Sequence, residues 1–140
     1  MLKRIASAMC VASLLASAVP ASAAGLASFV GTWTNNDPAT RGIVKIVITL
    51  KGTTLIVQPF GACVPTACDW GARAAIAYAP NVSAPVPTTA NAATATFPAS
   101  FKNDILTLTP EGSQLSVGDY TQFTDGSGRS NYDSMAMFHK

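Results

Sequence analysis

The segment GIVKIVITLKGTTLIVQPF, residues 42–60, decides the fold class of this chain. In its first half every second residue is apolar, which is the period of a β-strand with one buried face. The apolar positions are Val44, Ile46, Ile48 and Leu50. Lys45 and Thr49 lie on the opposite face. The Lys51-Gly52 pair then predicts a tight turn into a second strand, so the segment is expected to form an antiparallel hairpin.

The same alternation recurs along the rest of the chain, and no segment has a sustained helical period. Eight strands are expected, over residues 29–34, 42–50, 53–60, 70–78, 93–101, 105–109, 114–123 and 132–140. Most are joined by short turns, including Lys102-Asn103-Asp104 and Glu111-Gly112-Ser113. Residues 79–91 and 124–131 are rich in proline or glycine and are expected to be longer loops.

Consecutive hairpins predict an all-β fold built as an antiparallel meander. A small sheet with apolar residues must close on itself or pack against another sheet to bury them. A small up-and-down barrel of about eight strands does this most simply and is about the size that holds one small ligand. A two-sheet β-sandwich is the alternative, because the sequence does not determine closure.

The first 23 residues have the features of a secretory signal peptide. Lys3 and Arg4 precede an apolar run, residues 5–19, that is too short to span a bilayer. The small residues Ala21-Ser22-Ala23 then predict cleavage after Ala23. We therefore expect a single all-β domain over residues 24–140 and a secreted or periplasmic location.

The charge of the chain argues against two classes of partner. The full sequence has 9 Lys and Arg and 7 Asp and Glu, so loss of Lys3 and Arg4 would leave equal numbers of both signs. A neutral chain has no basic surface for nucleic acid or for an anionic membrane. We expect no nucleic-acid partner and no membrane insertion after signal cleavage.

The segment GACVPTACDWG, residues 61–71, places Cys63 and Cys68 in a loop with four residues between them. A tetrahedral zinc site would need two further ligands, and the only histidine is His139. A thioredoxin-like redox motif has two residues between its cysteines, whereas this pair has four. In an oxidising compartment the pair is expected to form a structural disulfide.

Three segments, GTWTNNDPATRGIV, GACVPTACDWG and FTDGSGRSNY, resemble a family of small exported bacterial domains. The Gly31-Thr32-Trp33 sequence in the first strand also resembles the calycin pattern of lipocalins and, more loosely, avidins. In lipocalins the tryptophan closes one end of the barrel, and an arginine near the last strand packs over it. This resemblance implies a calycin-like barrel in which Gly31, Trp33 and Arg129 have that structural role.

The side chains give little support for an enzyme. His139 has no obvious partner that would orient it as a general base. The carboxylates that could act as a catalytic pair fall in turns or on strand faces predicted to be exposed, where Asp is common for other reasons. They are Asp69, Asp119, Asp125 and Asp133. We predict no catalytic residues, no cofactor and no metal site.

The leading functional hypothesis is non-covalent binding of a small, largely apolar ligand inside the barrel. Trp70, Tyr78 and Tyr120 are the candidate contacts, and residues 79–91 could form a lid. Gln58, Asp119 and Gln122 are polar residues within predicted strands. Any of them that points inward must find a partner, such as water or a ligand.

Two alternatives use other features. The loop closed by the expected Cys63–Cys68 disulfide could present Val64-Pro65-Thr66 to a protein partner, as an exported protease inhibitor would. A closed ring lowers the entropy cost of binding. Alternatively, side chains could fill the barrel completely and leave a structural domain without a pocket.

Overall fold

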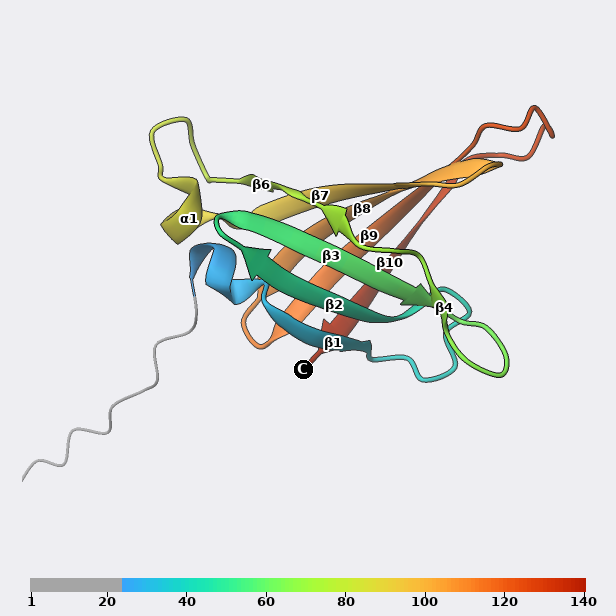
Figure 1. The fold of residues 1–140 in the computed structure, drawn as a ribbon, viewed down its shortest axis with the longest axis horizontal. Coiled ribbons are helices and arrows are strands. Elements are labelled where there is room, and N and C mark those ends of the chain that lie inside the picture. Colours follow the sequence, from blue (N-terminus) through green and yellow to red (C-terminus); the bar gives the residue numbers. More distant parts are fainter. Residues whose placement is uncertain (1–23) are drawn as a thin grey trace, which may run out of the picture.

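The computed structural model describes residues 24–140, so the predicted signal peptide lies outside the described residues. These residues form ten strands, one short 3₁₀-helix and one short α-helix (Figure 1). In chain order the elements are η1 (Gly25–Ser28), β1 (Gly31–Asn35), β2 (Ile43–Lys51), β3 (Thr54–Gly61), β4 (Cys68–Asp69), β5 (Arg73–Ala74), β6 (Ile76–Tyr78), α1 (Val86–Thr89), β7 (Ala92–Pro98), β8 (Lys102–Glu111), β9 (Gln114–Phe123) and β10 (Tyr132–His139). The all-β prediction is confirmed.

All ten strands belong to one antiparallel sheet. Its order is β4-β3-β2-β1-β10-β9-β8-β7-β6, with β5 also paired to β3. Every neighbouring pair on this path except β1-β10 is consecutive in the chain, and the β8-β9 ladder is the longest. The predicted meander of hairpins is therefore present, with β1 and β10 bringing the two ends of the chain together.

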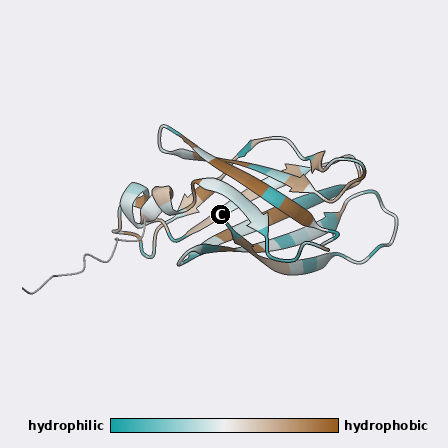
Figure 2. Ribbon diagram, turned by 90° about the horizontal axis from the view of Figure 1, so that it is seen from below, coloured by the Kyte–Doolittle hydropathy of each residue, from teal (hydrophilic) through white to brown (hydrophobic). Residues whose placement is uncertain are grey.

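The hydrogen-bonded order of the sheet is open, and a closed barrel is not shown. The segment between residues 68 and 78, expected as one strand from Trp70, is broken into three short pieces. β4 and β5 pair with β3, whereas β6 pairs with β7. The sheet folds over into two layers with the core between them, which is consistent with the sandwich alternative (Figure 2).

The core consists of the inward-facing residues of both layers. Its largest fully buried side chains include Trp33, Phe29, Phe138, Ile46, Ile48, Leu55, Leu106, Leu108 and Leu115. In β2 the predicted face is correct at Ile46 and Ile48 but not at the strand ends. A β-bulge between Ile43 and Lys45 shifts the register, so Ile43 is buried in place of Val44. Leu50, near the hairpin turn, is 43% exposed.

Two local predictions in the second half of the chain are wrong. Lys102-Asn103-Asp104 is not a turn but the first part of β8, and the turn before it is closed by the Ala99 N–H donating to the Lys102 carbonyl at 2.7 Å. The loop at 79–91 contains the helix α1, which contacts η1 at one end of the molecule (Figure 1). Gly25 makes this contact feasible, because a Cβ there would lie 2.4 Å from the Pro87 carbonyl oxygen.

Candidate functional site

A cleft opens where β1 and β10 separate. Their pairing is limited to Thr34 with His139 and Asn35 with Phe138, after which the Asn36 N–H donates to the Met137 carbonyl at 2.8 Å. The chain then turns away through residues 36–42, so the first half of β10 pairs with β9 alone in the described structure. A cavity of about 330 Å³ lies in this gap. It is lined by Asn35, Thr40, Arg41, Gly42, Ile43, Val117, Asp119, Tyr132, Ser134, Met135, Ala136 and Phe138.

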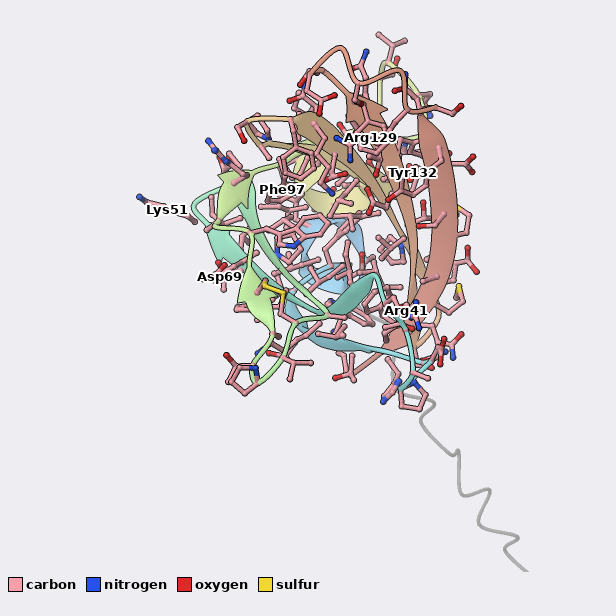
Figure 3. All side chains as sticks on the ribbon, turned by 90° about the vertical axis from the view of Figure 1, so that its right-hand side faces the viewer. Arg41, Lys51, Asp69, Phe97, Arg129 and Tyr132 are labelled. Carbon is pink, nitrogen blue, oxygen red and sulfur yellow. A yellow bond between two sulfur atoms is a disulfide. The ribbon has the colours of Figure 1, made fainter. Side chains whose placement is uncertain are left out.

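The rim formed by residues 36–42 is held by side-chain hydrogen bonds. Asn35 is buried, and its Nδ2 donates to the Ile43 carbonyl at 2.8 Å while its Oδ1 accepts from the Asp37 N–H at 2.8 Å. Asp37 Oδ1 in turn accepts from the Ala39 N–H at 2.9 Å. These bonds fix the rim against the sheet. Arg41 lies on this rim, and Figure 3, which looks onto this end of the molecule, shows Arg41 and Tyr132 on the side of β10.

Asp119 is the acidic group of the cavity. In the β9 register it lies opposite Leu106 on one side and Ser134 on the other, on the inward face that also carries Val117. Its Oδ1 is buried and makes no hydrogen bond within the described residues. Burial and then the nearby charge of Asp104 raise the pKa of Asp119 from 3.8 to about 6, against a smaller opposing effect of Lys102.

The neighbouring acid, Asp104, is fully partnered. It is 3% exposed, its Oδ1 accepts from the Thr121 hydroxyl at 2.8 Å, and its Oδ2 lies 2.8 Å from the Lys102 ammonium. Only Asp119 of this pair therefore has a free buried acceptor. Buried polar atoms are normally hydrogen-bonded, so an unpartnered carboxylate oxygen on a cavity wall indicates a place for an external donor.

The three predicted ligand contacts are not brought together. Trp70 is half-buried and packs edge-on against Phe97, with ring centroids 6.2 Å apart. Tyr78 is 44% exposed on β6, where its hydroxyl lies 3.0 Å from the Thr94 hydroxyl. Tyr120 alternates with Asp119 along β9 and so projects outward, 45% exposed. None of the three lines the cleft.

The predicted packing of Arg129 over Trp33 is also wrong. Trp33 is buried, its Nε1 donates to the Phe29 carbonyl at 2.7 Å, and the cation near its ring is Lys140, with Nζ 4.6 Å from the centroid. Gly31 lies beside the same lysine. The antiparallel register places Trp33 beside the end of β10, whereas Arg129 precedes the beginning of that strand.

Arg129 instead organises the loop at 124–131. Its guanidinium lies 4.0 Å from the Phe123 ring centroid and 2.7 Å from Asp125 Oδ2. Hydrogen bonds from Ser127, followed by those from Arg129, lower the pKa of Asp125 to about 2. The loop is thereby tied together by its own side chains, at the opposite end of the molecule from η1 (Figure 1).

The predicted disulfide is present. Cys63 and Cys68 are joined, with their Cα atoms 5.5 Å apart. The residue after Cys68 fixes the loop to the sheet, because Asp69 Oδ2 accepts a hydrogen bond from Gln58 Nε2 at 2.8 Å across the β3-β4 pair. Val64 inside the ring is 97% exposed.

Sequence reasoning identified Asp119 as a polar residue in a strand but not the rest of the cleft. The alternation Leu115, Val117, Asp119, Thr121 was the available signal that Asp119 points inward. Asn35, Arg41 and Ser134 gave no such signal, because their positions depend on where β1 leaves β10.

Comparison of the chain with protein-family models, with curated proteins and with solved structures gave no match. Within residues 24–140 no three His, Cys, Asp or Glu side chains are grouped to hold a metal ion. No helix in this part of the chain is long and apolar enough to cross a membrane.

Proposed function

We propose that this protein is an exported binding protein whose ligand enters the cleft between β10 and residues 36–42. The ligand is small and largely apolar, with one hydrogen-bond-donating or cationic group. The observation that carries this proposal is the buried, unpartnered Oδ1 of Asp119 on the wall of a cavity of about 330 Å³. Cavities of this size are typical of small-molecule sites, which combine apolar walls with a few polar groups that fix orientation.

The wall chemistry supports this ligand class. Val117, Ala136 and Phe138 supply apolar surface, and Asp119 is the one carboxylate among the lining residues. A ligand ammonium would replace the missing partner of Asp119 and form a charge-assisted hydrogen bond, which is stronger than a neutral one. The disulfide is compatible with the proposed secreted or periplasmic location.

Hexylamine and hexanoate form a matched pair of probes for this site. Hexylamine should shift the backbone NMR resonances of Val117, Asp119 and Ser134 at pH 7.5, and hexanoate should bind at least about tenfold more weakly, because only the amine can pair with the carboxylate. Lowering the pH below about 6 should weaken hexylamine binding, since protonation removes the charge of Asp119.

Two variants make the probe experiment decisive. Asp119→Asn should remove the preference for the amine, whereas Asp133→Asn, a change of the exposed acid on the same edge, should retain it. Equal binding of both probes to the wild type, or an unchanged preference in Asp119→Asn, would contradict the proposal. Native mass spectrometry of the protein purified from its own host would then identify any ligand retained.

A second candidate function is favoured by the exposure of the loop that the Cys63–Cys68 disulfide closes. Val64 is 97% exposed at the tip of a ring that is closed by Cys63–Cys68 and anchored by Asp69. A preorganised loop of this kind is suited to inserting a side chain into a groove of a partner protein, such as a protease.

Reduction of the disulfide separates the two candidates. Opening this small ring should lower the free energy of unfolding by about 2 kcal/mol in the loop-entropy account, so the domain should stay folded at 25 °C. Inhibition of a panel of proteases should be lost on reduction if the loop is the binding element, while hexylamine binding should be unchanged. Loss of hexylamine binding with the fold intact would instead place the ligand at the loop.

A further inference from the structure

The outward side of β7–β10 carries mainly uncharged polar side chains. Residues that are paired across these strands form successive rows, which we call the outer face. Its rows are Thr94, Thr107, Gly118 and Met135; Thr96, Ile105, Tyr120 and Asp133; and Asn103 with Gln122. Hydroxyl and amide groups dominate these rows, and Asp133 is their one charged side chain.

Tyr120 lies down along the sheet at the centre of this face. A Cβ built on Gly118 would be 3.1 Å from Tyr120 Cε2 and 2.9 Å from Met135 Sδ. Both side chains therefore lean over the space that the glycine leaves. Since Tyr120 is 45% exposed, part of the ring that leans over Gly118 is open to solvent.

Exposed apolar surface gathers around this ring. Ile105 is 37% exposed and Met135 is 62% exposed, next to Tyr120 in the same or the adjacent row. A shallow recess of about 350 Å³ borders Ile105 and Tyr120. It is lined by Ile105, Tyr120, Thr121, Gln122, Asn131, Tyr132 and Asp133. Contiguous exposed apolar groups of this kind, rimmed by polar ones, mark binding surfaces.

We propose that the outer face binds a neutral polysaccharide chain, with Tyr120 as the platform on which a sugar ring stacks. A pyranose has an apolar C–H face that fits a flat aromatic ring and an equator of hydroxyls that need hydrogen-bonding partners. Gln122, Asn131 and Asp133 supply such partners beside the ring. The outer face has no cationic side chain in its rows, so acidic polymers gain no attraction from it.

This surface is independent of the cleft. Side chains alternate between the two sides of a strand, so Tyr120 and Asp119 face opposite sides of the sheet. Tyr132 borders both the recess and the cleft, and Met135 of the outer face also lines the cleft, but neither residue carries either proposal. Failure of one proposal therefore leaves the other untouched.

Titration of the ¹⁵N-labelled protein with cellohexaose, chitohexaose and maltohexaose tests the proposal. At least one of these neutral oligosaccharides should shift amide resonances of β8, β9 and the start of β10. Tyr120→Ala should weaken that binding by about tenfold or more, which is the scale of one lost aromatic stacking contact. Tyr120→Phe should bind nearly as well as the wild type, because it keeps the ring.

Phe101→Ala is the matched control, since Phe101 is an aromatic residue 41% exposed outside this face. Gln122→Ala provides a second test if Tyr120→Ala uncovers Gly118 and fails to fold. The proposal is wrong if none of the three oligosaccharides shifts an amide of β8–β10. It is equally wrong if the Tyr120 and Gln122 variants bind as tightly as Phe101→Ala.

Discussion

Trp33→Ala is expected to lower the free energy of unfolding by about 3–5 kcal/mol, the range for deletion of a fully buried large aromatic side chain. Trp33 is 1% exposed and is the largest residue in the core. Its replacement would leave a cavity between the layers and would also remove the hydrogen bond from Nε1 to the Phe29 carbonyl. Urea denaturation, followed by circular dichroism, measures the change.

Trp70→Ala is the matched control for this prediction. Trp70 is only half-buried and contacts Phe97 at the edge of the core, so its loss should cost less than half as much. If Trp33→Ala does not fold at all, Trp33→Phe supplies a graded change that keeps most of the ring volume but loses the hydrogen bond. Equal destabilisation by the two alanine variants would contradict the central position assigned to Trp33.

The local pattern of the sequence was sufficient for most of the strands. Strand β9 occupies the predicted residues 114–123, and two hairpin turns lie at Gly52-Thr53 and Gly112-Ser113, within one residue of their predicted positions. These features depend on alternation and turn chemistry within about ten residues. Such information is local, so it can be extracted from one sequence.

Lys102-Asn103-Asp104 illustrates why other features could not be predicted. Three consecutive polar residues indicate a turn, yet they begin β8 and Asp104 is buried. The strand tolerates this carboxylate because Thr121, seventeen positions away, donates to it and Lys102 pairs with it. A single sequence does not reveal which distant residue will be the partner.

The predicted ligand contacts are not brought together in the structure for the same reason. Trp70, Tyr78 and Tyr120 were chosen for their chemistry, but they lie on different surfaces. The strand registers place Tyr78 and Tyr120, and Trp70 follows β4 outside any strand. The cleft exists because β1 and β10 pair over only two residues before they separate. That event depends on the packing of the two chain ends, and residues 36–42 do not indicate it by themselves.

Asp119→Asn is expected to stabilise the ligand-free protein by about 1–2 kcal/mol at pH 7.5 and to change its stability little at pH 4. The pKa of Asp119 is about 6 in the folded chain against an ordinary value of 3.8, so the folded state holds this proton more tightly than the unfolded state. The contribution of Asp119 to stability is therefore most favourable below pH 4 and declines as the pH rises to about 6. Two pKa units correspond to about 3 kcal/mol, reduced here because Asp119 retains some contact with solvent.

Urea denaturation of the wild type and Asp119→Asn between pH 4 and pH 8 isolates this contribution. Arg41 and His139 are common to both proteins, so their own contributions cancel in the difference between the two curves, whereas the effects of Asp104 and Lys102 on the Asp119 charge remain part of that difference. That difference should grow between pH 4 and pH 6 and then level off, whereas Asp133→Asn should track the wild type. A constant difference would mean that the Asp119 carboxylate is not buried without a partner in the folded protein. The proposed ligand site would then lack the observation on which it rests.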